Sequence, residues 1–436
     1  MATTVEYPTR KPAPPAPPIR DVTRTDCCIV GSGPAGAVLA LLLARQGIPV
    51  TLLEEHKDFD REFRGDTIHP SVMEILDELG LAERVLALPH TKMHTMTVQT
   101  DAGPTVIADF RRLHTRYPYV LLIPQVEFLQ FITAEAARYP AFRLVMGARV
   151  EALVEEADCI RGVRYRTAAG WHEVRARLTV GADGRFSRVR RLAGFTAEAT
   201  SAPMDVLWFR LPRRPDDLVE GIGRLGRGAI LAMLPREDHW QLGYVIRKGQ
   251  YAAMKAAGIQ TLRDAIVALL PAWADRVAAL HSRHDVSLLS VESSRLPQWY
   301  RRGLLLIGDA AHVMSPVGGV GINYAIQDAV VTANLLSGPL QTRRLHLRDL
   351  AAVQAQREGP TRRIQAIQSF MQNAVLERAL RSPSFHIPAP VRLLLRLPGI
   401  RTIPARVVGY GFGAAHVARP TRSQRKQAAQ LLCCLV

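Results

Sequence analysis

The chain has 436 residues, 48% of them hydrophobic, and a formal net charge of +17 at pH 7. This length exceeds one typical domain, so two interleaved domains with sizeable cores are expected. The basic residues are mostly arginines scattered along the chain without interleaved aromatic residues, which argues against a nucleic-acid surface. A solvated basic surface is the simplest interpretation, with an anionic membrane surface or an acidic substrate as alternatives.

The cysteines and the apolar runs bear on the location of the protein. None of the five cysteines has metal-site spacing, and Cys27 and Cys28 fall within an apolar run. The N-terminus lacks the apolar core of a signal peptide, and no run approaches the ~20 apolar residues of a transmembrane helix. These features predict a cytoplasmic protein with reduced thiols and no metal ion.

The first 24 residues are rich in proline, which predicts a disordered or polyproline arm. Residues 26–55 then read as strand, tight turn, helix and strand, with apolar runs at 27–30 and 49–53 and helix formers at 37–46. The turn between the first strand and the helix fits the pattern G-x-G-x-x-G of dinucleotide-binding folds: Gly31-Ser32-Gly33-Pro34-Ala35-Gly36.

Each glycine of this turn meets a physical demand of pyrophosphate binding. Gly31 permits the sharp turn, Gly33 lets the backbone approach the anion, and Gly36 lets the helix pack closely on the sheet. The helix N-terminus offers free N–H groups to the anion. Glu54 follows 54 − 31 = 23 residues after the first glycine, where a carboxylate can accept hydrogen bonds from a ribose. The stretch therefore predicts binding of FAD or NAD.

The rest of the chain alternates short strands and helices. Helices are predicted at 71–80 and 125–139, and strands of the same region at 93–100, 105–110, 143–150, 160–167, 171–176 and 178–180. A second, antiparallel group of strands is predicted at 203–211, 229–234, 240–247 and 286–293, with helices at 261–270 and 272–280. A strand at 303–307 and a helix at 323–336 follow, and the pattern from residue 345 onward is helical.

Two of these strands end in a carboxylate. Asp183-Gly184 follows a strand that ends at Gly181, and the simplest interpretation is an Asp-Gly turn before a helix that Ser187 caps. Gly308-Asp309 follows the strand at 303–307, and a loop rich in glycine leads from it into the next helix. The second carboxylate can bind the ribityl hydroxyls of a flavin, and the helix can direct its positive end at the flavin ring.

Together the three stretches resemble the group A flavoprotein monooxygenases, the para-hydroxybenzoate hydroxylase-like family, over about residues 25–340. The resemblance implies that Glu54 binds the adenosine ribose, Asp183-Gly184 lies near the FAD pyrophosphate and the NAD(P)H site, and Asp309 binds the ribityl chain. It also implies a flavin-facing loop that carries Pro316, Gly318 and Gly319. The full set of implied cofactor-binding residues is Gly31, Gly33, Pro34, Ala35, Gly36, Glu54, Glu55, Arg64, Gln125, Val150, Asp183, Gly184, Gly308, Asp309, Pro316, Gly319, Gly321, Ile322 and Asn323.

The implied fold is α/β, with a Rossmann-like FAD-binding domain interleaved with a β-sheet substrate domain and followed by a C-terminal helical segment. The FAD-binding domain is expected at 25–95, 125–200 and 300–340, the substrate domain at 96–124 and 201–299, the arm at 1–24, and the helical segment at 341–436. A monomer and a homodimer both stay open.

The implied activity is that of an FAD-dependent monooxygenase. NAD(P)H reduces FAD, dioxygen gives a C4a-hydroperoxyflavin, and one oxygen atom is transferred to a hydrophobic or aromatic substrate, which is hydroxylated or epoxidised. No side-chain catalytic residue or metal ligand is predicted. Two alternatives stay open: a flavin-dependent reductase of a polyprenyl-like substrate, and a non-catalytic flavin-binding protein associated with a membrane. The halogenase motif W-x-W-x-I-P is missing from the sequence, which argues against a flavin halogenase.

Other side chains are expected to be structural more often than functional. His312 is interpreted as a packed histidine rather than a base, and the arginines at 185, 188, 190 and 191 as a solvated helix face, with nucleotide binding as the alternative. Aromatic and sulfur side chains of the second group of strands could line a substrate pocket, although half should be core because alternate strand residues face opposite sides: Trp208, Met233, Trp240 and Tyr244.

Overall fold

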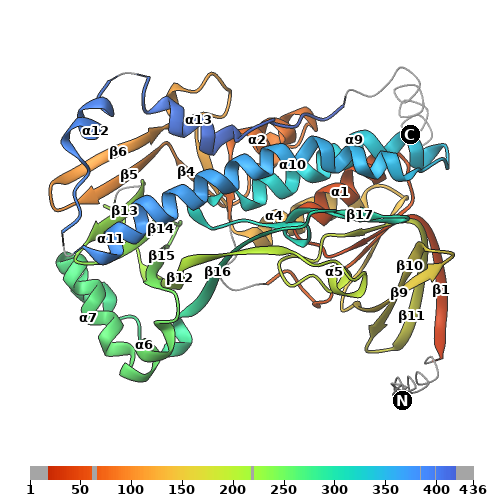
Figure 1. The fold of residues 1–436 in the computed structure, drawn as a ribbon, viewed down its shortest axis with the longest axis horizontal. Coiled ribbons are helices and arrows are strands. Elements are labelled where there is room, and N and C mark those ends of the chain that lie inside the picture. Colours follow the sequence, from red (N-terminus) through yellow and green to blue (C-terminus); the bar gives the residue numbers. More distant parts are fainter. Residues whose placement is uncertain (1–17, 61–65, 218–219, 383, 398, 419–436) are drawn as a thin grey trace, which may run out of the picture.

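The computed structural model describes residues 18–60, 66–217, 220–382, 384–397 and 399–418. Two large sheets lie side by side and long helices run across them (Figure 1). Most of the predicted arm, Arg64, and the tail beyond residue 418 lie outside the described residues. Within the described residues, no helix combines the length and the apolar character needed to cross a membrane.

The first sheet has a parallel centre in the order β18-β11-β1-β2-β8. The carboxyl-terminal residues of β18, β11, β1 and β2 are all buried, and most of them are apolar. Such buried runs are typical of a parallel sheet that is covered on both faces. Helix α1 (Pro34–Arg45) packs between α4 (Gln125–Ala137) and α9 (Gly321–Gln341) in the same core. The strands are β1 (Ile19–Val30), β2 (Val50–Leu53), β8 (Phe142–Val145), β9 (Arg149–Glu156), β10 (Cys159–Thr167), β11 (Gly170–Gly181), β17 (Tyr300–Arg301) and β18 (Leu304–Leu306).

Strand β1 begins at Ile19, so the prediction of an arm up to residue 24 was wrong for its last six residues. These residues pair in parallel with the first half of β11, where Ile19 lies opposite Trp171 and Arg24 opposite Arg175. The segment is mostly polar and mostly exposed, so no local pattern marks it as a strand. A neighbouring strand supplies its hydrogen bonds, and tertiary pairing therefore decides its conformation.

The second sheet has the order β19-β16-β12-β15-β14-β13-β5-β6 and is antiparallel except where β13 meets β5. Helices α6 (Tyr251–Ala257), α7 (Ile259–Leu269) and α8 (Ala274–Val277) cover one face, and α11 (Glu377–Arg381) contacts the other. The strands are β5 (Thr95–Thr100), β6 (Gly103–Asp109), β12 (Glu198–Pro212), β13 (Gly221–Gly226), β14 (Ala229–Pro235), β15 (His239–Arg247), β16 (Ser287–Arg295) and β19 (His312–Val313). This antiparallel sheet agrees with the second group of predicted strands.

A third, small sheet has the strand order β3-β7-β4. Its strands are β3 (Thr67–Ile68), β4 (Thr91–Met93) and β7 (Val120–Leu122). The strand predicted at 93–100 is therefore two strands in two sheets, divided at His94. Residues 120–122 were predicted in the substrate domain but pair with β3 and β4, while β19 joins the second sheet from a region predicted to bind FAD. The predicted domain boundaries thus differ from the sheet boundaries at both places.

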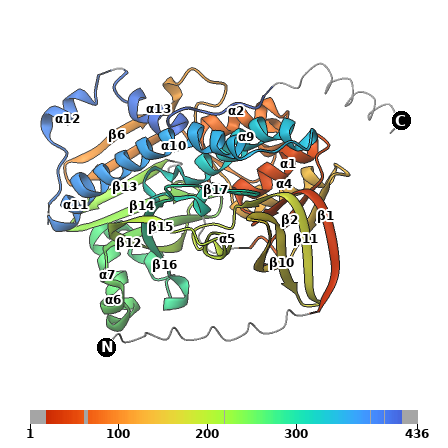
Figure 2. The same ribbon diagram turned by 45° about the vertical axis from the view of Figure 1, so that its right-hand side comes forward.

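The C-terminal segment is helical, as predicted, and it joins the two large sheets. Helix α10 (Leu347–Phe370) packs along α9 and continues through a π-helical turn into α11 beside the second sheet (Figure 2). Helix α13 (Thr402–Tyr410) returns to β6 and to α2 (Pro70–Glu78). The remaining helices are α3 (Ala82–Val85), α5 (Arg188–Leu192) and α12 (Ala389–Leu394). The α/β fold with a C-terminal helical segment is confirmed.

Candidate functional site

The turn from β1 into α1 has the shape that its glycines predict. Gly31 has φ +97°, and a Cβ there would lie 2.5 Å from the carbonyl oxygen of Ala182, directly after the neighbouring strand β11. A Cβ at Gly36 would lie 1.9 Å from the carbonyl oxygen of Gly31. Side chains at these two positions would clash with backbone, so the close approach of turn, helix and sheet requires glycine.

The outer side of the same turn is open and polar. A Cβ at Gly33 would meet nothing within 4 Å, and the buried hydroxyl of Ser32 has no partner in the described part of the chain. The backbone N–H of Ser32 donates to Glu54 at 2.9 Å, so Glu54 braces the turn from the end of β2. A 12-residue helix begins directly after, at Pro34. An orphaned hydroxyl, free space and a helix N-terminus fit the pyrophosphate of FAD.

Asp183 is half-buried two residues after the end of β11, and its side chain holds the following turn together. Its carboxylate accepts hydrogen bonds from Ser187 Oγ at 2.5 Å, Arg188 N at 2.6 Å and Val189 N at 3.0 Å. Burial raises the pKa of Asp183, although these hydrogen bonds oppose the shift. Ser187 caps α5, as predicted, by accepting from the N–H of Arg190 at 2.9 Å. Asp183 therefore has a structural role whether or not a nucleotide lies beside it.

Arg190 is not on a solvated face, so the interpretation of the arginine cluster was wrong at this residue. Its guanidinium donates to the carbonyl oxygens of Arg185 at 2.6 Å, Ala310 at 3.1 Å and Asp309 at 3.4 Å. Burial lowers the pKa of Arg190. Arg188 also pairs within the protein, with Glu151 at 2.7 Å. Arg190 thus ties the turn after β11 to the turn after β18.

The predicted carboxylates lie along one edge of the first sheet. Glu54 follows β2, the glycine turn follows β1, Asp183 follows β11 and Asp309 follows β18. These are adjacent parallel strands in the order β2-β1-β11-β18, so their carboxyl ends meet at the same edge. The structure therefore brings together four stretches that are up to 278 residues apart in the sequence (309 − 31).

The loop after β19 and the start of α9 are fastened to the small sheet. Gly318 and Gly319 have φ +80° and +64°, and the hydroxyl of Thr67 donates to the carbonyl oxygen of Gly319 at 2.8 Å. The side chain of Asn323 accepts from His69 N at 2.8 Å and donates to the carbonyl oxygen of Thr67 at 3.0 Å. Helix α9 begins at Gly321, two residues before the predicted start. Asn323 therefore shapes the loop, and its side chain is occupied within the protein.

The other predicted cofactor residues are spread around this edge. Pro34 and Ala35 open α1, Gln125 opens α4, and Ile322 lies in the first turn of α9. Val150 is buried in β9. Glu55 is half-exposed and pairs with Arg149 at 3.3 Å. Flavin contacts of these residues stay predictions.

Behind Gly308 lies a buried charge network that sequence reasoning missed. Asp328 of α9 accepts from Gly308 N at 3.0 Å, pairs with His312 Nε2 at 2.6 Å, and accepts from Arg357 Nε of α10 at 2.7 Å. Burial acts to raise the pKa of Asp328, but His312 and Arg357 outweigh it and hold the pKa below its usual value. His312 also packs against Trp299, with ring centroids 4.9 Å apart, so the interpretation of a packed histidine is confirmed.

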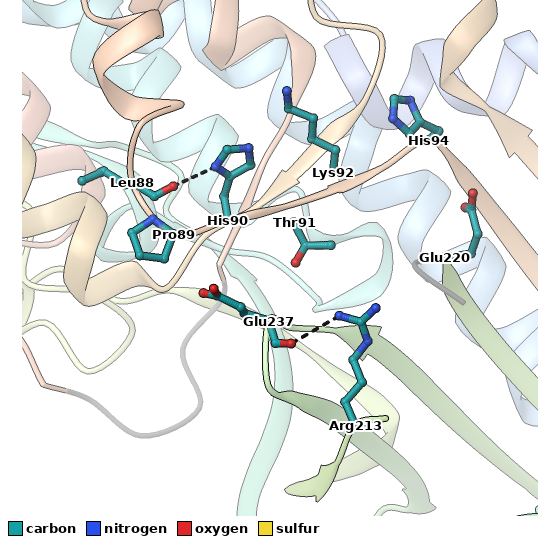
Figure 3. Close-up of a pocket in the computed structure, with 9 residues that line it drawn as sticks. All are labelled: Leu88, Pro89, His90, Thr91, Lys92, His94, Arg213, Glu220 and Glu237. Carbon is teal, nitrogen blue, oxygen red and sulfur yellow. Dashed lines mark hydrogen bonds between the residues drawn. The ribbon is translucent and has the colours of Figure 1, made fainter. Parts of the chain in front are cut away.

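A cavity of about 820 Å³ opens between the small sheet and the second sheet (Figure 3). One side carries the segment around β4, and the other carries residues that flank β12, β13 and the β14–β15 hairpin. Figure 3 shows Arg213 and Glu237 facing the segment of His90 and Lys92. The full lining is Leu88, Pro89, His90, Thr91, Lys92, His94, Arg213, Glu220 and Glu237.

Most of the predicted pocket-lining residues of the second sheet belong to its core instead. Met233, Trp240 and Tyr244 are buried under α7 and α8. Trp208 lies on the opposite face, in the same cluster as Val317 of the loop that was predicted to face the flavin. Alternation along the strands explains the division. The face of Trp208 is therefore the one turned toward the cofactor loop.

Comparison with known proteins agrees with this geometry. Residues 24–356 match the family described as FAD binding domain. The chain is 37% identical over 405 residues to 6-methylpretetramide 4-monooxygenase of Streptomyces rimosus, covering 92% of this chain and 95% of that protein. It is 32% identical over 327 residues to 12-dehydrotetracycline 5-monooxygenase/anhydrotetracycline 6-monooxygenase of Streptomyces rimosus subsp. rimosus, covering 70% of this chain and 61% of that protein.

A solved structure shows the same fold. The OxyS anhydrotetracycline hydroxylase from Streptomyces rimosus has a TM-score of 0.69 at 24% identity, covering 92% of this chain and 78% of that chain. The comparisons confirm the predicted family, FAD as the cofactor and monooxygenation as the reaction class. The chain belongs to the FAD-binding domain family and is an FAD-dependent monooxygenase of the group A flavoprotein type.

Proposed function

We propose that the protein hydroxylates a polycyclic aromatic substrate of the polyketide type, with NAD(P)H as the electron donor. The observation that carries this proposal is the 37% identity to 6-methylpretetramide 4-monooxygenase across 92% of this chain. Because the alignment covers 92% of this chain, it includes the second sheet as well as the cofactor edge. Similarity in those parts supports a related substrate, because the cofactor edge alone is shared by enzymes with many substrates.

We assign the first sheet and the small sheet to FAD and the second sheet to the substrate. The glycine turn and the α1 N-terminus would hold the pyrophosphate, Glu54 the adenosine ribose, and Asp309 the ribityl chain. The loop at 316–321 would lie against the ring. FAD supplies electron transfer from NAD(P)H and the activation of dioxygen.

The protein itself binds and orients the ligands and excludes water from the site. Thr67 and Asn323 fix the glycine loop, so its backbone is already in place before a ligand arrives. The face of Trp208 and Val317 is apolar, which suits an aromatic ring system and excludes water from it. Arg190 joins the two carboxylate turns and keeps their spacing.

The experiment is a product analysis under ¹⁸O₂. FAD-loaded protein is mixed with NADPH or NADH and a panel of hydroxylated naphthalenes, anthraquinones and tetracyclic polyketides. The proposal expects a product that carries one ¹⁸O atom, formed only with dioxygen and reductant. Reduction of a double bond without ¹⁸O would instead favour the reductase alternative, and inertness toward the whole panel would refute the substrate class.

We also propose that the protein is cytoplasmic and that its C-terminal surface touches anionic membranes. Cys27, Cys28 and Cys159 are free thiols, which suits a reducing compartment. Around α12, apolar side chains are exposed beside arginines at 392 and 396: Val391, Leu393, Leu394, Leu397 and Ile403. Apolar groups flanked by arginine suit the surface of an anionic bilayer.

A further inference from the structure

Arg236 is a buried cation at the boundary between the small sheet and the second sheet. It lies in the turn that joins β14 to β15, and 5% of its surface is exposed. The guanidinium pairs with Asp66, which directly precedes β3, and its Nε and Nη2 donate to Gln241 Oε1 at 3.1 and 2.8 Å. The third nitrogen, Nη1, is buried without a partner in the described part of the chain.

This arrangement lies next to the loop that was predicted to face the flavin. Asp66 is adjacent in sequence to Thr67, whose hydroxyl is bonded to the carbonyl oxygen of Gly319. The main chain of Asp66 is also fixed, because its carbonyl oxygen accepts from Ile123 N at 2.9 Å. The Arg236 guanidinium is thus held between the substrate sheet and the cofactor loop.

The cavity between the small sheet and the second sheet also has buried nitrogen atoms without hydrogen-bond partners in the described residues. Two of its lining residues also carry buried ring or guanidinium nitrogens without partners in the described residues, Arg213 at Nε and His94 at Nδ1. Arg213 donates to the carbonyl oxygen of Arg236 at 2.8 Å, so the two arginines are neighbours. A buried guanidinium nitrogen that lacks an acceptor costs free energy, and two of them on neighbouring arginines point to a ligand whose oxygen atoms supply the acceptors.

A second buried arginine, Arg276 of helix α8, shows what a structural ion pair looks like. Arg276 places both terminal nitrogens on Asp217, at 2.5 and 2.7 Å, and Trp273 covers its guanidinium with the ring centroid 4.5 Å away. It lies on the face covered by α7 and α8, away from the cofactor loop. Arg276 also leaves one nitrogen, Nε, without a partner in the described residues, but both of its terminal nitrogens are bonded to Asp217. Arg236 differs because the nitrogen without a partner is a terminal one, Nη1, next to the cofactor loop.

We propose that Arg236 anchors an oxygen of the aromatic substrate, a phenolate or an enolised carbonyl, through Nη1, and that Asp66 and Gln241 are positioning residues that orient the guanidinium. The proposal rests on the proposed function and names the feature of the substrate that is recognised. An anionic oxygen held by Arg236 makes the ring to which it is attached richer in electrons. Electron-rich positions of that ring are the ones that an electrophilic oxygen attacks, so the anchor also directs the site of hydroxylation.

The test is ligand binding to the FAD-loaded protein, with emodin and tri-O-methylemodin as the probes. Both have the same ring system, but only emodin can present a phenolate. Wild type is expected to bind emodin at least tenfold more tightly, with a preference that grows as pH rises through the ionisation of the emodin hydroxyl. Arg236→Met should remove about ten- to a hundredfold of this preference and its pH dependence, because the ligand's charge-assisted bond is lost. Arg236→Lys should restore part of both.

Control variants distinguish direct binding of the substrate oxygen by Arg236 from a purely structural role of a buried arginine. Arg276→Met removes a buried arginine of α8, on the other face of the second sheet, and should keep the full preference for emodin. Asp66→Asn should weaken the preference less than Arg236→Met, because the guanidinium stays but is less well oriented. FAD affinity and NADPH-dependent flavin reduction without emodin are measured in both Arg236 variants, so that a loss of substrate anchoring can be told from damage to the cofactor site.

Four results would overturn the inference. These are equal binding of the two probes by wild type, no binding of emodin by wild type, an unchanged preference in Arg236→Met, and slower substrate-free flavin reduction in both Arg236 variants. The last result would assign Arg236 to the nicotinamide nucleotide. None of them bears on the incorporation of ¹⁸O, so a failure here leaves the proposed function to its own test.

Discussion

Asp309 stands at the carboxyl end of β18, on the edge where the cofactor residues meet. We predict that Asp309→Ala weakens FAD binding about ten- to a hundredfold, because a charge-assisted hydrogen bond is worth roughly 1.5–3 kcal/mol. Fluorescence titration of the apoprotein with FAD measures the change. Asp264→Ala, on the exposed side of α7, is the matched control and should leave FAD affinity as it is. Equal affinities of wild type and Asp309→Ala would remove Asp309 from the binding site.

His69 makes stability depend on pH. It is buried, its Nδ1 donates to the carbonyl oxygen of Val408 at 2.7 Å, and burial lowers its pKa to about 4 from the usual 6.5. Between these two values the unfolded chain binds more protons, so this contribution to stability is complete above pH 6.5 and is lost as pH falls toward 4. From pH 7 to pH 5 the loss from this one group is about 2 kcal/mol.

Urea denaturation of wild type and His69→Gln at both pH values tests this prediction. The variant should lose less stability on acidification, by about 2 kcal/mol. His284→Gln, in an exposed turn, should behave as wild type. Parallel losses in wild type and His69→Gln would show that His69 is not the group that titrates.

Single residues were predictable from sequence where a local rule governs them. The Ser187 cap and the glycine turn follow from short-range geometry, and both are present. Arg190 and Asp328 were missed because their partners come from distant segments, at Ala310 and Arg357. Burial of a charged side chain is decided by tertiary packing, which no local pattern reports.

Helix α10 supports the cofactor edge through Arg357, which pairs with Asp328 behind Gly308. We predict that Arg357→Met lowers the free energy of unfolding by about 3–5 kcal/mol, because Asp328 would remain buried without its full set of partners. FAD affinity should fall as well, since Asp328 accepts the N–H of Gly308 beside Asp309. Denaturation and FAD titration are the measurements. Arg362→Met, exposed on the same helix, should change neither; a stable Arg357→Met with normal affinity would contradict the prediction.

The loop at 316–321 should control how well oxygen transfer is coupled to NAD(P)H oxidation. A Cβ at Gly319 would lie 2.7 Å from Thr67 Oγ1 at a φ of +64°, so Gly319→Val should move the loop from the small sheet and admit water. More hydrogen peroxide per NAD(P)H oxidised is expected, measured by a peroxidase-coupled dye against product formed. Gly249→Val has a similar φ, +85°, but open space, and should keep wild-type coupling. Unchanged coupling in Gly319→Val would exclude the loop from this role.

Elements were predictable where hydrophobic periodicity is strong. The strands at 27–30 and 240–247 and the helix at 323–336 lie within β1, β15 and α9. Strand β13 was missed because its sequence, GIGRLG, has three glycines and no alternation of apolar residues. The predicted strand at 143–150 is interrupted at Gly147, where φ is +66°. In the first case the glycines hide a strand that its neighbours impose, and in the second a glycine with positive φ separates two strands that the sequence pattern had joined.

At the scale of the whole molecule, the net charge of +17 and the exposed apolar side chains around α12 predict binding to anionic membranes. The protein should sediment with vesicles that contain phosphatidylglycerol and not with pure phosphatidylcholine, and added salt should weaken the binding. The double substitution Leu393→Glu and Leu397→Glu should abolish sedimentation. Leu288→Glu, at an exposed leucine of the second sheet, is the control. Absence of wild-type sedimentation would end the membrane proposal.

The order of the strands in the first sheet has a consequence for biosynthesis. Its last parallel strand, β18, ends at Leu306, and the carboxylate turn follows at once. During translation, β1, β2 and β11 are therefore made long before β18, the strand that pairs with β11. All strands of the second sheet except β19 are translated in between or earlier. A nascent chain cannot complete the cofactor edge before β18 is made. Translation products that stop short of β18 would lack Asp309 and one of the parallel strands that form this edge.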